Sequence, residues 1–234
     1  MIRAYLFLSM FIPLTFLCAL SALLCTLVDG SGRIFAFHAR LWARICLLLA
    51  GTRVTLYGAE HLPPGPVIFM SNHQSGFDIP TLLATLPRGA CWIVKKELFK
   101  IPVFGNAMAR GGYIPLDRRD ANQALKSMEK AVDLIRSGKS VLIFPEGTRT
   151  TDFRLLPFKR GGFMLAQRSG APVIPVTING SARVNPAGSR RLYPGRITVT
   201  LHPPILPETL ASRGESEAVL KKKVHDAISS VLEV

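Results

Sequence analysis

Apolar and polar residues follow two different patterns along this chain, and the change falls near residue 53. Ala4 to Val28 is an uncharged, mostly apolar run. It exceeds the roughly 20 residues that a helix needs to cross a bilayer, and lipid-embedded helices tolerate a kink such as Pro13 would cause. A cleaved signal peptide starting near Arg3 is the alternative, but the run is long for one and no clear small-residue cleavage site follows. We therefore expect a membrane-embedded first helix.

The next segment, Ile34 to Ala50, has the pattern of an amphipathic helix. Its arginines recur at spacings of seven and four, which places them on one stripe; they are Arg33, Arg40 and Arg44. The opposite side carries Leu41, Ile45, Leu48 and Leu49. The pattern predicts an interfacial helix whose arginines meet phosphate headgroups, or a helix packed on the following domain, and the two are compatible. Residues 29–32 are the expected turn between the helices.

From Arg53 onward, short β-rich runs alternate with helical periodicity. The predicted strands are Val54–Tyr57, Val67–Met70, Cys91–Val94, Tyr113–Leu116, Val141–Phe144, Val173–Ile178 and Ile197–Leu201. The predicted helices are Ile79–Leu86, Asp120–Ser137, Gly161–Arg168 and Glu215–Leu232. In the second of these helices Leu125, Met128, Val132 and Ile135 form the apolar stripe, and Gly138 suits the C′ position. This alternation predicts an α/β fold with a mixed, largely parallel sheet flanked by helices. Residues 1–52 would form a membrane-binding helix pair, and residues 53–234 a second domain.

Composition adds a membrane preference to this picture. The formal net charge is +14, and hydrophobic residues make up 48% of the chain. Basic proteins bind polyanions such as nucleic acid or anionic lipid, but a nucleic-acid binder usually has a polar surface. A basic and apolar chain therefore favours a membrane surface over nucleic acid. The four cysteines lack the C-x-x-C spacing of a zinc site or a disulfide framework; they are Cys18, Cys25, Cys46 and Cys91.

Candidate chemistry begins directly after the second predicted strand, in the segment 72–78 (Asn-His-Gln-Ser-Gly-Phe-Asp). His73 and Asp78 would lie about 140° apart on one ideal helix, so they can meet only across a loop-to-helix junction. A carboxylate on an imidazole fixes its tautomer and supports its positive charge, and histidine suits general-base chemistry near neutrality. The alternative is an Asp78 that only caps the next helix, beside an unrelated loop histidine.

Three further clusters lie at or within predicted strands. Residues 144–149 (Phe-Pro-Glu-Gly-Thr-Arg) place a guanidinium, which suits phosphate, beside a flexible glycine; a surface Arg–Glu pair in a turn is the alternative. Residues 111–119 place Arg118 at a strand end, where it would meet a phosphate or form a solvated charge pair. Residues 171–176 carry two prolines in an apolar strand, which predicts an edge strand or a bulge.

Taken together, the order and spacing of these clusters resemble the four motifs of the glycerolipid acyltransferase family, in particular the bacterial 1-acyl-sn-glycerol-3-phosphate acyltransferases. Residues 91–102 are also similar to the family's segment between its first two motifs. The resemblance covers nearly the whole chain to at least Val176. H-x4-D followed by Phe-Pro-Glu-Gly-Thr-Arg is highly specific. The second domain is then an acyltransferase catalytic domain.

The resemblance implies a site and a reaction. His73 would deprotonate the free sn-2 hydroxyl of 1-acyl-sn-glycerol-3-phosphate, with Asp78 orienting it, and the oxygen would attack an acyl thioester directly to form phosphatidic acid. The expected substrate-binding residues are Asn72, Lys95, Arg118, Glu146, Gly147, Thr148 and Arg149. Of these, Lys95, Arg118 and Arg149 would hold the phosphate, and Glu146 and Gly147 would shape the acceptor pocket. No metal, cofactor or covalent acyl-enzyme is implied.

The expected partners are the lipid bilayer, a lysophospholipid acceptor, and acyl-CoA or acyl carrier protein as donor. We expect the catalytic domain on the cytoplasmic side of the cell inner membrane. One alternative keeps the chemistry but acylates another lysolipid, such as lyso-ornithine lipid. A non-catalytic basic module that binds membrane or nucleic acid is a more distant alternative, since it explains neither strand-end cluster. A serine hydrolase ranks low because the chain has no G-x-S-x-G elbow.

Overall fold

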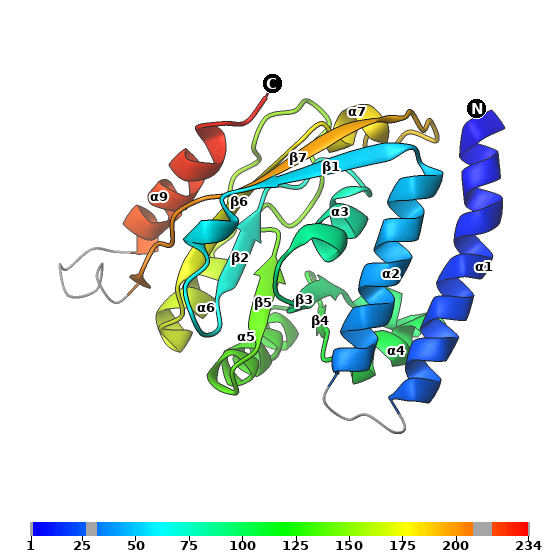
Figure 1. Cartoon of the computed structure of the whole chain (residues 1–234). Coiled ribbons are helices and arrows are strands. Elements are labelled where there is room, and N and C mark those ends of the chain that lie inside the picture. Colours follow the sequence, from blue (N-terminus) through cyan, green and yellow to red (C-terminus); the bar gives the residue numbers. More distant parts are fainter. Residues whose placement is uncertain (1, 27–31, 208–216, 234) are drawn as a thin grey trace.

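Two long helices precede the sheet and lie side by side in the computed structural model, which describes residues 2–26, 32–207 and 217–233 (Figure 1). α1 (Ile2–Cys25) lies at one side of the molecule, and α2 (Arg33–Leu49) packs against it. α1 is long and apolar enough to cross a membrane by length and composition. The predicted turn at residues 29–32 falls almost entirely outside the described residues, as does the end of the predicted first helix.

A mixed, largely parallel sheet of seven strands forms the centre, as predicted. The strands are β1 (Thr52–Tyr57), β2 (Ile68–Ser71), β3 (Ala90–Lys95), β4 (Ile114–Leu116), β5 (Ser140–Ile143), β6 (Val173–Asn179) and β7 (Gly195–Leu201). Their order is β1-β7-β6-β2-β5-β3-β4. Among these described strands only β6 and β7 pair antiparallel, with Val176 opposite Leu201. β2, β5, β3 and β4 therefore end at the same edge of the sheet.

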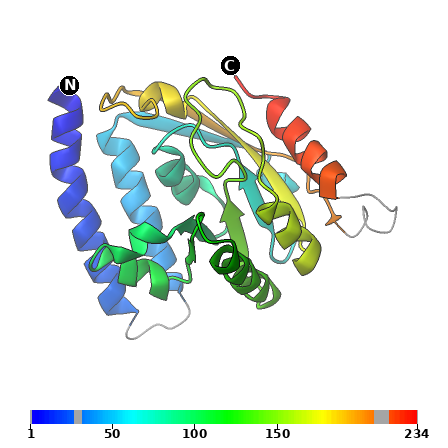
Figure 2. The same ribbon diagram turned by 180° about the vertical axis from the view of Figure 1, so that it is seen from behind.

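Helices cover both faces of the sheet. They are α3 (Asp78–Thr85), α4 (Phe104–Arg110), α5 (Ala121–Arg136), α6 (Gly161–Ser169), α7 (Ser181–Val184) and α9 (Glu217–Ser229), with 3-10 turns η1 (Ala59–His61) and η2 (Lys96–Lys100). Side chains alternate across a strand, so β2 sends Phe69 to one core and Ile68 and Met70 to the other. The first core joins the sheet to α1–α4, and the second joins it to α5, α6 and α9. Figure 2 shows the long connection from β5 to α6 beyond the carboxyl end of β5.

The apolar faces of two helices differ from the prediction. In α2 the buried residues are Phe35, Ala43, Cys46 and Leu47, whereas Leu41 and Leu48 are exposed. The reason is that α2 packs against both α1 and α3, so the positions of these two helices determine which of its residues are buried. Arg40 donates from Nη2 to the carbonyl of Leu86 over 2.7 Å, so it binds the protein rather than only a headgroup. In α5 the predicted apolar stripe is buried except for Leu125, which is exposed. Gly138 follows this helix with a φ of 90°, which suits the predicted C′ position.

The two prolines at β6 predicted either an edge strand or a bulge, and the structure shows a bulge. β6 lies inside the sheet between β7 and β2, so it is not an edge strand. It does have a bulge: Val176 pairs with Leu201 and Val173 with Ile205, so the facing chain has one extra residue between the two pairs. Pro175 lies in this interval, and its carbonyl accepts from the backbone N–H of His202 over 3.0 Å. A strand interior accepts a proline here because the ladder is already interrupted.

Candidate active site

His73 and Asp78 form a close pair where β2 ends and α3 begins. The Nδ1 atom of His73 lies 2.7 Å from Oδ2 of Asp78, and the Asp78 side chain is fully buried. An ionised carboxylate only accepts hydrogen bonds, so Nδ1 carries the hydrogen and Nε2 is left with a free lone pair. The His73 side chain is 14% exposed. A buried carboxylate on Nδ1 with Nε2 able to take a proton is the arrangement of a general base.

Asp78 does not cap α3 in the way that was expected. It is the first residue of that helix, and Phe77 occupies the N-cap position. Its Oδ2 atom turns back to the preceding loop and accepts the backbone N–H groups of Gln74 and Ser75 over 2.8 and 2.9 Å. The carboxylate therefore organises the loop that carries His73, which is a stronger constraint on the imidazole than a helix cap.

Residues from the loop after β5 hold His73 from the other side. The rings of His73 and Phe144 stack with centroids 4.0 Å apart and planes 14° from parallel. Oε1 of Glu146 accepts the backbone N–H of His73 over 2.6 Å, and the carbonyl of His73 accepts the N–H of Thr150 over 2.9 Å. Side chain and main chain of His73 are thus both fixed by residues about 70 positions later in the sequence.

Glu146 positions the loops rather than offering its oxygens to a ligand. It is buried, and its second oxygen, Oε2, accepts the N–H of Leu156 over 2.8 Å. Burial raises the pKa of Glu146 to about 7, against the lowering effect of the Leu156 and His73 hydrogen bonds. With both oxygens used by backbone donors, the expected role in shaping the acceptor pocket is indirect.

Gly147, Thr148 and Arg149 continue this loop toward His73. Gly147 has a φ of 72°, a conformation that glycine adopts without strain. Thr148 and Arg149 are exposed. A Cβ on Gly76 would lie 3.7 Å from Nη1 of Arg149, so this guanidinium reaches the loop between His73 and Asp78. Among the expected phosphate ligands, Arg149 is the one that the fold brings directly to the pair.

Lys95 and Arg118 lie farther along the same sheet edge. Lys95 ends β3, two strand positions from β2, and Arg118 follows β4, three positions from β2. At about 4.8 Å per strand this is roughly 10 and 14 Å between backbones. Lys95 is 57% exposed, and its Nζ lies 3.8 Å from Oε1 of Glu97. An ion pair between Lys96 and Asp117 joins the ends of β3 and β4.

Asn72 is tied into the fold through its side chain. It is fully buried, and its side chain bonds twice to the backbone of Ile178 in β6: Nδ2 donates to the carbonyl over 2.8 Å and Oδ1 accepts the N–H over 2.7 Å. It ties the end of β2 to β6 and so supports the loop that follows. Both polar atoms of its amide are used within the fold, and the expected contact of Asn72 with substrate stays a prediction.

Lys159 and Phe144 were missing from the predicted site. A Cβ on Gly147 would lie 3.1 Å from the ammonium nitrogen of Lys159, which places this cation over the Glu-Gly-Thr-Arg loop. The backbone N–H of Lys159 donates to the carbonyl of Pro145 over 2.8 Å, which holds this lysine against the loop. The only sequence signal was the basic pair after Phe158. Phe144 lay within the quoted motif, but stacking on an imidazole leaves no pattern in a sequence.

Two apolar cavities lie between the N-terminal helices and the catalytic residues. The first, of about 580 Å³, is lined by Phe7 and Phe11 of α1, by Gly76 and Phe77 of the His–Asp loop, and by Leu98. The second, of about 110 Å³, runs deeper between α1, α2 and α4 and reaches Trp92 and Tyr113. The His–Asp loop therefore borders a space that suits an alkyl chain.

Comparison with known proteins agrees with this class of site. The family model described as Acyltransferase matches residues 53–179. The chain is 41% identical over 172 residues to the chloroplastic 1-acyl-sn-glycerol-3-phosphate acyltransferase BAT2 of Brassica napus, covering 72% of this chain and 49% of that protein. It is 36% identical over 171 residues to the 1-acyl-sn-glycerol-3-phosphate acyltransferase of Saccharomyces cerevisiae, covering 71% and 56%. The chain spans about half the length of the curated relatives it matches.

A solved structure has the same fold. The crystal structure of the 1-acyl-sn-glycerophosphate (LPA) acyltransferase PlsC from Thermotoga maritima superposes with a TM-score of 0.82 at 24% identity, covering 99% of this chain and 96% of that one. The fold and the strand-edge pair define an α/β protein in which a buried carboxylate holds an imidazole. The chain belongs to the acyltransferase family.

Proposed function

We propose that this protein transfers a fatty acyl group from an acyl thioester to the free sn-2 hydroxyl of 1-acyl-sn-glycerol-3-phosphate, forming phosphatidic acid in phospholipid biosynthesis. The observation that carries the proposal is the His73–Asp78 pair, 2.7 Å apart, beside an apolar cavity of about 580 Å³. Family membership and the activity for which the curated relatives are named support the same reaction.

The chemical step uses side chains of the protein alone and needs no metal or cofactor. Nε2 of His73 takes the proton of the acceptor hydroxyl while that oxygen attacks the thioester carbonyl carbon. The carbon–sulfur bond then breaks, and the departing thiolate receives the proton from the His73 imidazolium. Asp78 stabilises the imidazolium that forms between these two events.

Substrate binding follows from the charges at the sheet edge. Arg149 lies next to the His–Asp loop and is proposed as the main phosphate ligand, because a guanidinium can bind phosphate oxygens through two N–H groups. Lys95, Arg118 and Lys159 add positive charge around it. The acyl chain of the acceptor or donor would occupy the apolar cavities beside α1.

The proposed location is the cytoplasmic side of the cell inner membrane. α1 carries a row of exposed apolar side chains that would lie in lipid, and the cavity beside the catalytic loop is lined by the same helix. A lysolipid could then reach His73 without leaving the bilayer. The donor would be acyl-CoA or acyl carrier protein, and parallel assays with both decide between them.

The decisive experiment is transfer of a labelled acyl group from a thioester into lysophosphatidic acid by the purified chain. His73→Ala should lower kcat about 10²–10⁴-fold, the usual contribution of a general base. His225→Ala is the matched control, because His225 is an exposed histidine on α9, away from the site, and should keep the parental rate. A parental rate for His73→Ala would contradict the mechanism.

An acceptor panel tests the substrate separately. The parent should prefer lysophosphatidic acid to lyso-ornithine lipid and to lysophosphatidylcholine. Preference for an acceptor without a phosphomonoester would overturn the substrate while leaving the role of His73 intact.

A further inference from the structure

A third cavity, of about 750 Å³, lies at the opposite edge of the sheet from His73. It is lined by Ala90 and Ser140, which begin β3 and β5, and by the amino-terminal half of α2. Those strands run parallel to β2, whose carboxyl end leads to His73, so the two sites are separated by the length of the sheet. Its inner wall shares Trp92 and Tyr113 with the smaller apolar cavity, but none of the catalytic or phosphate-binding residues proposed above lines it.

The polar wall of this cavity is basic. Four basic residues line it, Arg33, Arg40, Arg88 and Lys139, and none of the residues that line it is acidic. Within the described part of the chain, Arg40, Arg88 and Lys139 form no ion pair with a carboxylate. Cations around one hollow repel one another, and an anion in the cavity would relieve that repulsion.

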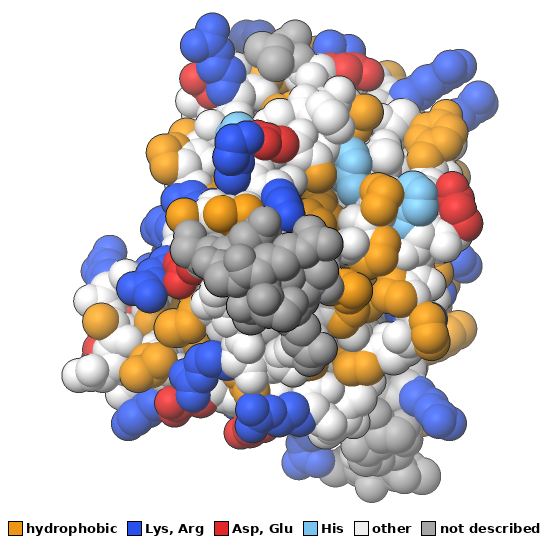
Figure 3. Space-filling view, turned by 90° about the vertical axis from the view of Figure 1, so that its left-hand side faces the viewer, with side chains coloured by type: hydrophobic (Ala, Val, Ile, Leu, Met, Phe, Trp, Pro, Cys, Tyr) orange, Lys and Arg blue, Asp and Glu red, His pale blue; other side chains and the backbone are white. Residues whose placement is uncertain are grey.

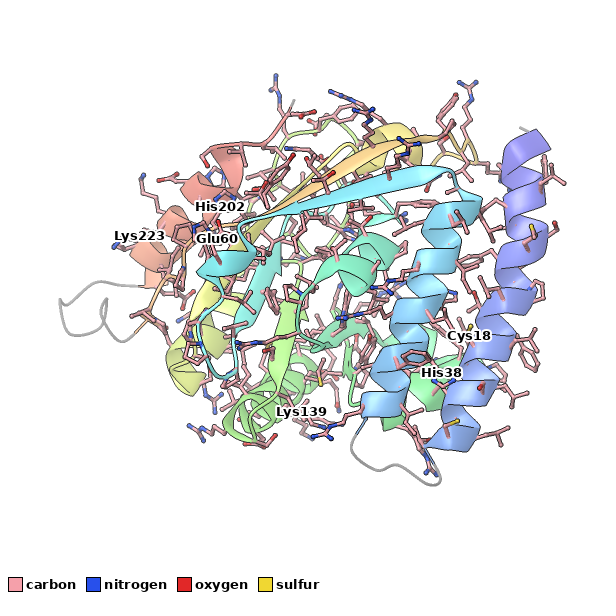
Figure 4. The ribbon with its side chains drawn as sticks, viewed as in Figure 1. Cys18, His38, Glu60, Lys139, His202 and Lys223 are labelled. Carbon is pink, nitrogen blue, oxygen red and sulfur yellow. The ribbon has the colours of Figure 1, made fainter. Side chains whose placement is uncertain are left out.

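Two of these cations, Arg40 and Arg88, are held in place by the fold. Arg40 donates from one nitrogen to the carbonyl of Leu86, and Arg88 from one nitrogen to the carbonyl of Gly65, each over 2.7 Å. A guanidinium has five N–H donors, so each keeps others for a ligand. Lys139 lies between α5 and the start of α2 in Figure 4. Fixed donors bind an anion at a lower entropic cost than free surface side chains.

The remaining wall is apolar, and one side of the cavity adjoins the surface of α2. Trp92 and Tyr113 form part of the inner wall. Phe37 also lines the cavity and is 64% exposed on α2. On the face shown in Figure 3, Lys and Arg side chains are dispersed. The cavity instead combines four basic residues with aromatic walls. Such a combination suits a ligand with an anionic head and an apolar body.

We propose that this cavity binds one anionic phospholipid, with its phosphate against Arg40, Arg88 and Lys139 and its acyl chains leaving past Phe37 along α2. The choice of lipid over a free anion rests on the membrane placement of the helix pair in the proposed function. Binding at this second site would hold the amino-terminal end of α2 at headgroup level and anchor the catalytic domain to negatively charged membrane.

The test is native mass spectrometry of the full chain in neutral detergent. The probe is phosphatidylglycerol, which is neither acceptor nor product of the proposed reaction, with phosphatidylcholine as the neutral lipid and inorganic phosphate as the free anion. The parent should retain one phosphatidylglycerol at least about tenfold more tightly than phosphatidylcholine, and millimolar phosphate should not displace it.

Three variants make this result specific. Lys139→Gln breaks no ion pair within the described part of the chain and should weaken phosphatidylglycerol binding about tenfold, the effect of one lost charge-assisted contact. Arg88→Gln combined with Lys139→Gln should weaken it further. Lys126→Gln removes an equal charge from the exposed side of α5 and should bind like the parent.

Either of two outcomes would overturn the proposal: equal retention of phosphatidylglycerol by the parent and by Lys139→Gln, or a site filled by inorganic phosphate in preference to lipid. Circular dichroism melting of each variant confirms that it is folded. The binding measurement involves no acyl transfer, so failure of the proposed reaction leaves it unaffected.

Discussion

His73 is held in place through both its imidazole ring and its main chain. Asp78 holds Nδ1, the Phe144 ring covers one face, and two backbone hydrogen bonds fix the main chain. Preorganisation of this kind means that little rotation is needed when the hydroxyl arrives. The predictions for single residues therefore compare variants that remove only a charge with variants that also remove hydrogen bonds.

Asp78→Asn should remove charge without disturbing geometry. Oδ2 receives all three hydrogen bonds, and Oδ1 has no partner in the described part of the chain, so an amide can keep the three bonds with its nitrogen at the Oδ1 position. The imidazolium then loses its counter-charge, and kcat should fall about 10²-fold or more while Tm changes little. Steady-state kinetics and thermal melting measure the two effects.

Asp78→Ala provides the contrast. It leaves the three donors without their acceptor, each at a cost of about 1–3 kcal/mol where the donor is buried, so Tm should fall as well as kcat. Equal Tm values for the Asn and Ala variants would contradict the organising role of this carboxylate.

Glu146 should make stability depend on pH. Burial raises its pKa from an ordinary 4.5 to about 7, so between these values the folded chain holds a proton that the unfolded chain has lost. The free energy of unfolding should therefore fall as pH rises from about 4.5 to about 7, by at most about 3 kcal/mol. Urea unfolding at pH 5 and pH 7.5 measures the difference.

Glu146→Gln has no proton to lose and should lack this component of the slope. Its amide also places an N–H group against one of the two backbone donors, from His73 or Leu156, so it should be less active than the parent. Glu129→Gln, an exposed change on α5, should keep the parental pH dependence. A parental slope in Glu146→Gln would show that another group titrates.

The sequence was sufficient for the central pair but not for the residues that support it. The spacing of His73 and Asp78 predicted a loop-to-helix junction, and the structure has that junction. The roles of Asn72 and Glu146 depend on Ile178 and Leu156, partners distant or unpatterned in the sequence. No local signal distinguishes an amide that binds substrate from one that ties two strands together.

For the helices and strands, the sequence pattern predicted an element well where its buried residues follow a regular spacing. All seven strands were predicted within two residues of their bounds, because short apolar runs bounded by turns leave a clear signal. α4 and α7 were missed: both are short, and Pro102 with Gly105 interrupts the periodicity of the first. The strand order could not be derived, because it depends on pairing between segments far apart in the chain.

Gly105 is required by the close approach of η2 and α4. A Cβ at this position would lie 2.1 Å from the carbonyl oxygen of Phe99, and backbone atoms cannot move away cheaply. Gly105→Ala should therefore destabilise the fold by about 1–3 kcal/mol, or roughly 2–12 °C in Tm. It should also raise the KM for long-chain substrates, because η2 carries Leu98, which lines both apolar cavities.

Gly161→Ala is the matched control for this prediction. A Cβ there would lie 3.6 Å from the sulfur of Met128, an ordinary contact, and alanine favours the helical conformation of α6. Its Tm should equal or exceed that of the parent. A stable Gly105→Ala variant would mean that η2 and α4 can separate without cost.

For the whole molecule, the exposed apolar surface is concentrated on the N-terminal helices. Leu6 and Leu17 of α1 are 62% and 61% exposed. Their burial in lipid would contribute about 1.5–3 kcal/mol each. Leu6→Gln combined with Leu17→Gln should reduce co-sedimentation with phospholipid vesicles about tenfold or more, without lowering Tm, because neither side chain belongs to the core.

Leu125→Gln controls for a general loss of surface hydrophobicity. Leu125 is 43% exposed on α5, on the other side of the sheet, and its replacement should leave vesicle binding unchanged. If both variants bind vesicles like the parent, α1 does not determine membrane attachment.

The position of β7 also sets the order in which the molecule can be completed during synthesis. β1 follows α2 directly, yet its partner in the sheet is β7, which also joins β1 to β6. Roughly 140 residues must leave the ribosome between β1 and β7, about 7–30 s at ordinary elongation rates. The apolar helix pair is therefore available to a bilayer well before the sheet can close, so the nascent chain would reach its membrane first and complete its fold there.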